Sequence, residues 1–444
     1  MITTSTEITD DVHNVGGLRA WFAVGMLSAL YACSFIDRQI LALMVEPIKR
    51  DLRLTDTQMS ILIGPAFAFF FAVLALPMGV IADRFSRKTL IAIGVAAWSC
   101  FTAGCGLTMN FTQLLLARMG VGVGEATLGP GAYSMITDYF RAEQLARAMS
   151  VFGIGVVVGS GLASLIGGYV IEASMTASAI HLPLIGYIRP WQLVFIVVGL
   201  PGLLLSTLLT LLVREPARRK PPARNPGIIA GTLGRQLRHR FRAYAAIMGG
   251  FGLFSLFGYG AGSWLPTYLI RVHHLPIHII GLTIGLATIT FGTIGTIAAG
   301  SINDRLVARG RIDAPFVVGP VIGVCFLGAG LLMALAPTPT IALAGIVVFS
   351  MFGAIWSGIT AAALQLMTPS DLRGRVSAVY MIINNGMGLG LGPLLMALAV
   401  DHIFESSLAV GKAIALVGVI AVPSGILLLW SGRRQYLDAV AANS

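Results

Sequence analysis

The chain consists mainly of long apolar runs, which are separated by short segments rich in charged and turn residues. Each run has about the 20 apolar residues that a helix needs to cross a bilayer. No alternating pattern of the kind found in membrane β-strands is present, so the runs are predicted to be helices. Thr55 and Gln58 have the spacing of a capping box at the start of the second run. We predict twelve spans, at residues 20–44, 57–81, 88–108, 112–138, 146–171, 191–213, 243–270, 279–301, 314–336, 340–367, 376–400 and 409–431.

The composition supports a polytopic membrane protein, because 56% of the residues are hydrophobic and only 11% are charged. A soluble domain has about 25% charged residues. The net charge of +11 raises the question of nucleic-acid binding, but basic loops that hold membrane helices in place explain it better. No nucleic-acid partner is therefore expected. The four cysteines lie in apolar runs without metal-ligand spacing, and we expect neither a metal nor a cofactor.

The distribution of basic residues predicts the orientation of the chain. With the N-terminus in the cytoplasm, 22 of the 30 Lys and Arg residues fall in inside segments and six fall in outside loops. Basic residues concentrate in cytoplasmic loops, so both termini are predicted to lie in the cytoplasm and the chain in the cell (inner or plasma) membrane. The remaining two, Arg38 and Arg118, lie within predicted spans.

The widest polar gap, 214–242, carries nine Lys and Arg residues and separates two groups of six spans. The two groups also repeat a motif, since GVIADRFSRK at 79–88 has a counterpart, GSINDRLVARGR, at 300–311. Parallel repeats of this kind are typical of transporters with a site between two halves. The predicted domains are an N-terminal tail (1–19), a six-helix bundle (20–213), a basic cytoplasmic linker (214–242), a second six-helix bundle (243–431) and a C-terminal tail (432–444).

Three stretches resemble motifs of the major facilitator superfamily. GVIADRFSRK resembles its signature G-x-x-x-D-R-x-x-R-K between helices two and three. LLLARMGVGVGEA, at 114–126, resembles its second motif with Arg118 in the arginine position, and the glycines of span five are similar to its third. The resemblance covers nearly the whole chain. It implies an all-α membrane protein with twelve transmembrane helices in two pseudo-repeated bundles, and a secondary transporter that works by alternating access.

Within the superfamily, two elements resemble the Spinster family. They are Phe35-Ile-Asp37-Arg38 and Gly122-Val-Gly124-Glu125-Ala126. Spinster proteins move lysophospholipids and sphingosine-type lipids, so the resemblance implies an amphipathic lipid cargo. Ser34 departs from the animal pattern, which leaves the exact lipid open. The same elements occur in organic-anion:proton symporters, and a small organic anion is the alternative cargo.

Four ionisable residues lie inside spans one and four: Asp37, Arg38, Arg118 and Glu125. A charge at the bilayer centre costs about 2.5–3.5 kcal/mol on insertion scales, so we expect the four to lie together. We predict that Arg38 pairs with Glu125 and that Asp37 and Glu125 couple transport to protons. Arg38, Arg118 and Glu125 are also predicted to bind the substrate. The alternative is a fixed ion-pair network that only braces the two spans.

The second half has no counterpart to these four charges. We therefore expect a cavity that is charged on one side and largely apolar on the other, which suits an amphiphile but also a small apolar acid. The candidates to bind substrate from this half are Tyr259, Trp264, Trp356, Asn384 and Asn385. For the two asparagines, an interhelical hydrogen bond is the alternative role.

The repeated loop motif predicts a cytoplasmic gate. In the superfamily, ion pairs at this loop close the cytoplasmic side of the outward-facing state. Glu143 is a candidate partner for the basic residues, and simple positive-inside anchoring is the alternative role for Arg87. The candidate gate residues are Asp83, Arg84, Arg87, Glu143, Asp304 and Arg305.

Other classes of function find little support in the sequence. No histidine box and no nucleophile paired with a base are found, so we do not expect an enzyme. His273, His274 and His278 could suggest a metal site, but Pro276 interrupts them. The expected partners are the lipid bilayer, protons and one lipid or small-molecule substrate, and we expect a monomer.

Overall fold

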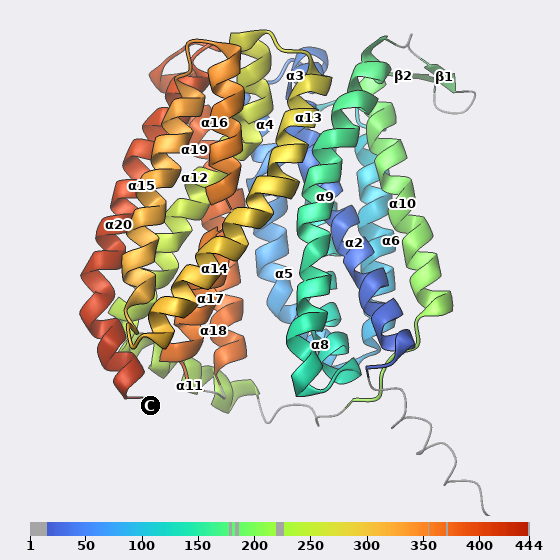
Figure 1. Cartoon of the computed structure of the whole chain (residues 1–444). Helices are drawn as coiled ribbons and strands as arrows, with labels where there is room; N and C mark the ends of the chain where they lie inside the picture. Colours follow the sequence, from blue (N-terminus) through green and yellow to red (C-terminus); the bar gives the residue numbers. More distant parts are fainter. Residues whose placement is uncertain are drawn as a thin grey trace, which may run out of the picture. The chain divides into compact units, whose positions relative to one another are not determined.

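The computed structural model describes residues 16–176, 180–182, 186–218, 226–353, 355–369 and 372–442. In these residues the chain is built almost wholly from helices, as the apolar runs predict (Figure 1). A short antiparallel hairpin is formed by β1 (Ile180–Leu182) and β2 (Gly186–Ile188). The predicted all-α membrane class is confirmed.

The helices up to residue 212 form the first six predicted spans, together with one short helix, α3, in the loop between spans one and two. Spans one, three, five and six are each formed by a single helix, whereas spans two and four are each divided into two. The bounds are α2 (Leu18–Leu43), α3 (Val45–Leu52), α4 (Asp56–Ile63), α5 (Pro65–Arg84), α6 (Arg87–Cys105), α7 (Phe111–Glu125), α8 (Leu128–Tyr139), α9 (Ala142–Thr176) and α10 (Pro190–Leu212).

The remaining helices correspond to the other six spans. The α-helices are α11 (Pro226–His239), α12 (Phe241–His273), α13 (Ile277–Ala287), α14 (Thr293–Ala308), α15 (Ala314–Ala334), α16 (Pro339–Phe352), α17 (Ile355–Met367), α18 (Arg373–Asn385), α19 (Gly392–Leu398) and α20 (Val410–Ala441). Three π-helical turns, η1 (Thr288–Gly292), η2 (Gly386–Leu391) and η3 (Ala399–Ile403), continue α13, α18 and α19. Two features differ from the expected pattern: α11 lies inside the polar gap, and α20 extends ten residues past the end of the last predicted span.

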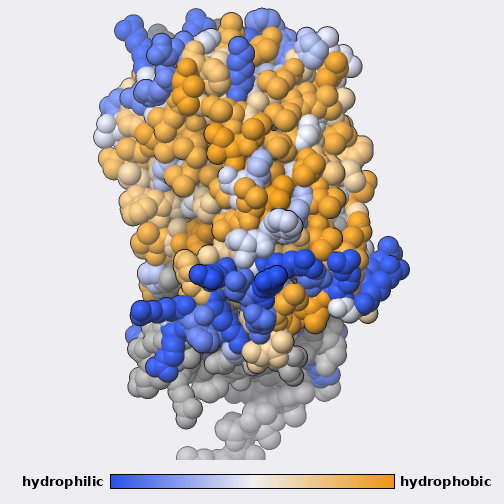
Figure 2. Space-filling view, turned by 90° about the vertical axis from the view of Figure 1, so that its left-hand side faces the viewer, coloured by the Kyte–Doolittle hydropathy of each residue, from blue (hydrophilic) through white to orange (hydrophobic). Residues whose placement is uncertain are grey.

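Length and surface both agree with a membrane protein. Ten helical stretches in the described residues are long and apolar enough to cross a bilayer. The other two predicted spans, 112–138 and 340–367, are formed by the shorter pairs α7 with α8 and α16 with α17. Leu427 and Trp430 on α20 are 66% and 71% exposed. On the face shown in Figure 2, hydrophobic residues form a broad belt between hydrophilic ends, as contact with lipid requires.

The contacts divide the chain into two compact units, each of which combines several segments. Unit one contains Met1–Ile40, Phe70–Ala163 and Ala173–Ala223, and unit two contains Leu41–Phe69, Ser164–Glu172 and Arg224–Ser444. Segments 41–69 and 164–172 therefore group with residues of the second half of the sequence.

Local sequence signals explain several helix ends. The predicted capping box is confirmed, since Thr55 Oγ1 accepts a hydrogen bond from Gln58 N at 3.1 Å. In return the Gln58 side chain accepts one from Thr55 N at 3.0 Å. The side chains of Ser86 and Asn110 accept equivalent bonds at the starts of α6 and α7. These bonds satisfy backbone donors that a helix leaves without partners.

Glycines set how closely the helices of unit one approach one another. A Cβ atom on Gly155 would lie 2.4 Å from the Ser28 carbonyl oxygen, and one on Gly159 would lie 2.4 Å from that of Ala32. α9 can therefore pack against α2 only because these positions lack a side chain, as the small-residue pattern predicts. Gly124 has the same role between α7 and α6, where a Cβ would lie 2.7 Å from Trp98 N. This contact holds the end of α7, and with it Glu125, against α6.

Candidate functional site

A buried cluster of charged residues lies inside unit one, where α2, α6 and α7 meet. α2 contributes Asp37 and Arg38, and α7 contributes Arg118 and Glu125. Asp37 is 2% exposed, and Arg118 and Glu125 are each 1% exposed. The four residues that the sequence singled out are thus in membrane-spanning helices, and three of them are buried almost completely.

The expected ion pair between Arg38 and Glu125 is present. Arg38 Nη2 lies 2.5 Å and Nε 2.7 Å from Glu125 Oε2. Ser34 Oγ donates a third hydrogen bond to the same oxygen at 2.5 Å. The other oxygen, Oε1, is buried and accepts no hydrogen bond within the described residues. One oxygen of the Glu125 carboxylate therefore accepts three hydrogen bonds, while the other accepts none in the described residues.

Asp37 is held in a similarly incomplete way. Its Oδ2 accepts a hydrogen bond from Thr102 Oγ1 on α6 at 3.1 Å, whereas its buried Oδ1 has no hydrogen-bond partner in the part of the chain that the structure describes. Asp37 also interacts electrostatically with Glu125 and with the two arginines, Arg118 and Arg38. Each of the two carboxyl groups can thus take up a proton on an oxygen without losing an existing hydrogen bond.

Arg38 is the most accessible charge of the cluster and the one with aromatic neighbours. Its side chain is 12% exposed. The guanidinium carbon lies 4.8 Å from the ring centroid of Phe35 and 4.9 Å from that of Phe71. Cation–π contacts of this kind stabilise a guanidinium in apolar surroundings. The cluster therefore presents a cation that is bordered directly by apolar rings.

The sequence reasoning missed Thr102 and gave no role to Ser34. Both are small hydroxyl residues in apolar runs. Such residues pack against neighbouring helices as often as they hydrogen-bond to a functional group. The available signal was helical spacing: Ser34 lies four residues before Arg38 and therefore on the same face of α2. Thr102 lies on a different helix, and its contact with Asp37 depends on tertiary packing alone.

The predicted substrate residues of the second half lie in unit two, with different surroundings. Trp264 is fully buried and donates its indole N–H to the Pro393 carbonyl at 3.0 Å. Trp356 is buried against Phe326, with ring centroids 5.1 Å apart. Both tryptophans have packing roles in this structure.

The polar candidates of unit two keep partial exposure. Asn384, Asn385 and Tyr259 are all half-buried. Asn384 Oδ1 accepts a bond from Tyr380 at 3.4 Å, which is a contact within α18 rather than between helices. Binding of substrate by these five residues of the second half stays a prediction.

A second ion network surrounds Arg87, which is 1% exposed at the start of α6. Arg87 pairs with Asp138 and, at 3.1 Å, with Glu215 Oε1. It also donates to Ser134 Oγ at 3.1 Å and to the Pro216 carbonyl at 2.8 Å. The structure thus gives Arg87 a set of partners within unit one that anchoring by positive charge alone would not require.

Glu215 completes this network and was missed in the sequence, although it is an acid in an otherwise basic gap. It accepts hydrogen bonds from Ser86 Oγ and, at 2.8 Å, from Arg87 N. Burial on its own would raise the pKa of Glu215. The bonds from Ser86 and Arg87, together with the Arg87 charge, outweigh burial and lower the pKa below its ordinary value.

The other predicted gate residues are less engaged. The Asp83, Arg84 and Arg305 side chains are exposed, and Glu143 and Asp304 lie outside the residues whose side chains the structure describes. The end of α5 is instead held by Arg218, which donates to the carbonyl oxygens of Ala82 at 2.9 Å, Phe85 at 2.5 Å and Asp83. The role of these residues in gating stays a prediction.

A third network, not anticipated from the sequence, centres on Asp56 in unit two. Asp56 is 1% exposed. Arg271 donates to both of its oxygens, at 2.7 and 2.8 Å, and Lys49 Nζ lies 2.5 Å from Oδ1. Arg271 Nε also binds Glu46 at 2.7 Å. Every oxygen of the Asp56 carboxylate is therefore hydrogen-bonded.

Comparison with known proteins identifies the relatives of the chain. A model of the Major Facilitator Superfamily matches residues 27–393. An MFS-type efflux pump of Mycolicibacterium smegmatis is 25% identical over 431 residues, which cover 96% of this chain and 96% of that protein. A hexuronate transporter of Bacillus subtilis is 25% identical over 407 residues, or 88% and 90% of the two chains.

A solved structure agrees with the sequence relatives. It is a bacterial homolog of the human lysosomal transporter Spinster, in an inward-facing, unoccupied conformation. It aligns with a TM-score of 0.75 and 25% identity over 96% of this chain and 98% of that one. The predicted major facilitator fold and the likeness to the Spinster family are confirmed.

Proposed function

The chain belongs to the Major Facilitator Superfamily, and we propose that it carries an amphipathic lipid, of the lysophospholipid or sphingosine type, together with protons. The protein is a multi-pass secondary transporter, like the relatives with which it aligns. The lipid, the coupling and transport by alternating access are what we add.

The observation that carries the proposal is the incomplete pairing of Glu125 and Asp37. Charges within spanning helices are expensive and tend to mark pathways for ions or substrates. A network that only braced two helices would gain most from saturating every carboxylate oxygen, because an unpaired buried acceptor is destabilising. In this cluster, Oε1 of Glu125 and Oδ1 of Asp37 are buried without a partner among the described residues.

The geometry supports a specific coupling between proton and substrate. Arg38 is held by the carboxylate of Glu125. A proton on Glu125 would remove most of that attraction and release the guanidinium, which could then bind an anionic head group bidentately. Proton and anion binding would therefore favour each other, and transport of the two in the same direction follows. Asp37 interacts electrostatically with Glu125, and a proton on either carboxyl group would relieve the repulsion between the two negative charges.

The surroundings of Arg38 support an amphipathic cargo. Phe35 and Phe71 lie within 5 Å of the guanidinium. A charged head group on Arg38 would therefore have an apolar surface beside it for the first carbons of a tail. A small sugar acid would gain little from these rings, although it could still use the arginine.

A small organic anion is the second candidate cargo. The likeness to the hexuronate transporter favours it, because the two sequences are 25% identical and the alignment covers 90% of that protein. The same release of Arg38 by a proton on Glu125 would serve a monocarboxylate equally well. The two candidates therefore differ in the cargo and share the coupling.

We further propose a monomer in the cell membrane with both termini in the cytoplasm. The orientation is supported by the distribution of basic residues, which places 22 of 30 on the side of the N-terminus. Cysteine labelling of single exposed positions in intact cells would test this orientation, and labelling of the C-terminal end from outside would overturn it.

Uptake into proteoliposomes tests the proposal. A labelled lysophospholipid and a labelled hexuronate are offered in parallel, each with and without an inward acid gradient. If one proton accompanies each monoanion, a gradient of one pH unit would concentrate the cargo about tenfold. Asp51→Asn, which changes an exposed carboxylate on α3, is the matched control for Asp37→Asn and Glu125→Gln.

The outcomes separate the claims. Gradient-driven movement of the lysolipid, lost in Asp37→Asn and Glu125→Gln but kept in Asp51→Asn, would support the proposal in full. Gradient-driven movement of the hexuronate alone would assign the second cargo. Movement of either compound that ignores the gradient would overturn the coupling.

A further inference from the structure

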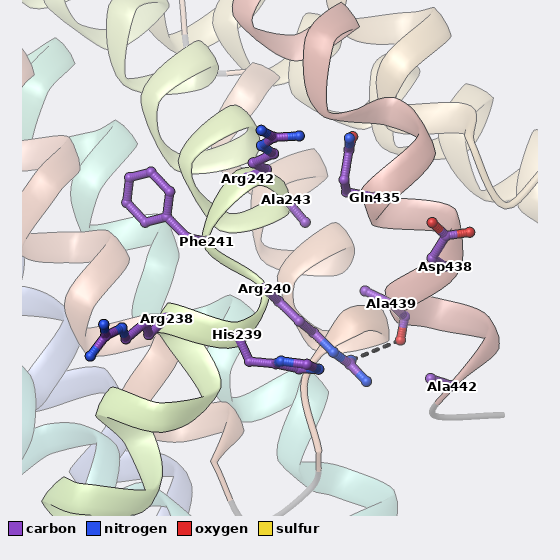
Figure 3. A pocket seen from close by; sticks show the side chains of 10 residues that line it. All are labelled: Arg238, His239, Arg240, Phe241, Arg242, Ala243, Gln435, Asp438, Ala439 and Ala442. Carbon is purple, nitrogen blue, oxygen red and sulfur yellow. Dashed lines mark hydrogen bonds between the residues drawn. The ribbon is translucent and has the colours of Figure 1, made fainter.

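A basic pocket lies in unit two, where the junction of α11 and α12 meets the last turns of α20 (Figure 3). Its volume is about 490 Å³. Three arginines and a histidine line one side: Arg238, His239, Arg240 and Arg242. Gln435 and Asp438 of α20 line the other. The proposed transport of substrate and protons does not involve these residues.

The positive charge of this pocket is not neutralised by neighbouring acids. Asp438 is the one carboxylate in the lining, against three guanidinium groups. Arg238 and Arg242 are exposed and form no ion pair within the part of the chain that the structure describes. The pocket therefore has an excess of positive charge that is free to attract an anion.

One arginine is fixed in place and shapes the wall. Arg240 Nη1 donates to the Met367 carbonyl oxygen at 2.9 Å and to that of Ala439 at 2.8 Å. Figure 3 shows this side chain reaching from the α11–α12 junction to α20. These bonds use neutral carbonyl oxygens, so the charge of Arg240 persists and its remaining N–H groups can serve a ligand.

The pocket lies at the level where membrane head groups are expected. α12 begins at Phe241 and α20 ends at Ala441, and both are long and apolar enough to cross a bilayer. Phe241 belongs to the lining and is 66% exposed, while Leu437 on α20 is 36% exposed. Apolar side chains beside basic ones are typical of the boundary between acyl chains and head groups.

We propose that this pocket binds the phosphodiester head group of an anionic glycerophospholipid, such as phosphatidylglycerol, as a resident lipid. Arg242, which Figure 3 shows beside Gln435, would hold the phosphate oxygens, for which a guanidinium is well suited. Arg238, which points away from α20 in Figure 3, would add to the positive potential of the site. Gln435 Oε1 is buried with no hydrogen-bond partner among the described residues, and with Asp438 it can accept bonds from head-group hydroxyls. A zwitterionic lipid would instead bring a second cation towards the arginines.

Native mass spectrometry of the full-length protein tests the proposal. The protein is released from mixed nanodiscs that contain phosphatidylglycerol, phosphatidylethanolamine and phosphatidylcholine in equal amounts. The test variant is the double substitution Arg238→Gln and Arg242→Gln, which spares the structural Arg240. The matched control is Arg309→Gln with Arg434→Gln, which removes two exposed arginines that do not line the pocket. Thermal unfolding in detergent shows whether each variant is folded.

The wild-type protein and the control should retain phosphatidylglycerol in preference to the other two lipids. The pocket variant should remain folded and lose affinity for phosphatidylglycerol about 30-fold, as expected for removing two surface cations. Equal retention by the wild type and the pocket variant, or equal loss in the control, would overturn the proposal. Displacement of the lipid by millimolar inorganic phosphate, with equal thermal stabilisation, would instead reassign the pocket to a free anion.

Discussion

Two buried carboxylates in this molecule are paired with arginine in different ways. Asp56 in unit two receives two bonds from Arg271 and one from Lys49, so neither of its oxygens is bare. Glu125 in unit one receives all its bonds on Oε2, while Oε1 has no partner in the described residues. Burial is the same, since both residues are 1% exposed. The two carboxylates differ in whether both of their oxygens accept hydrogen bonds.

The difference indicates what each pair does. A saturated carboxylate is held in its charged form by several donors, and a proton would have to displace one of them. A half-saturated carboxylate can accept a proton on the bare oxygen and then let its arginine go. We therefore interpret the Asp56 network as one that stabilises the fold, and the Glu125 cluster as the part that changes charge during transport.

The largest effect on stability is expected at the Asp56 network. Asp56→Ala would leave Lys49 without its carboxylate and Arg271 with Glu46 and the Ser407 carbonyl oxygen. Breaking a buried ion pair from one side typically lowers the free energy of unfolding by about 3–5 kcal/mol. Thermal and denaturant unfolding in detergent would measure the loss. A variant as stable as the wild type would show that saturation of Asp56 does not stabilise the fold.

Arg38→Ala is expected to have a smaller effect of the same kind. It leaves Glu125 buried with only the bond from Ser34, but the Arg38 side chain is 12% exposed and water can reach the gap. We expect a loss near the lower end of the range, about 3 kcal/mol, and a complete loss of transport. Arg38→Lys keeps the charge and should restore stability more fully than transport, because the lysine cannot make the bidentate contact.

Asp37→Asn should separate stability from function. Asp37 has one hydrogen bond, from Thr102, and asparagine can keep it through its side-chain oxygen. The free energy of unfolding should change by less than about 1.5 kcal/mol. Uptake that depends on the pH gradient should disappear. Unchanged pH-driven uptake would show that Asp37 only braces α2 against α6.

The smallest effect is the pH dependence that Glu215 contributes. Its folded-state pKa lies below the ordinary value of 4.5. The stabilisation is therefore complete above about pH 4.5 and is lost as the pH falls towards the folded-state value, because the unfolded chain takes up its proton first. Glu215→Gln should flatten the fall in stability in this range. An equally steep fall in the variant would assign the acid sensitivity to other groups.

The sequence predicted the helices and the chemistry of the main cluster well, and the reasons are local. Apolar runs, the Thr55 capping box and the glycines of α9 act within one helix or one contact. The pair of Arg38 with Glu125 could be inferred because two opposite charges deep in a membrane have few other partners. The contact of Gly124 with α6, by contrast, was hidden in a glycine pattern that occurs in many packed helices.

The networks that escaped prediction all depend on tertiary packing. Asp56 and Arg271 are 215 residues apart, and Arg87 and Glu215 are 128 apart. Asp56 lies just outside an apolar run, where an exposed acid is ordinary. Glu215 is the one acid of the basic gap, but its position in the sequence does not indicate which arginine it contacts. The basic pocket is similar, since the charges of Arg238, Arg240 and Arg242 were visible but their meeting with α20 was not.

The central claim is that the half-saturated cluster binds a proton together with the substrate. The most direct test is to record proton movement in proteoliposomes that contain an internal pH indicator, when substrate is added without an imposed gradient. The account predicts that inward movement of the anionic substrate acidifies the interior, and that Glu125→Gln abolishes this signal. Substrate uptake by the wild-type protein without any change of internal pH would contradict it.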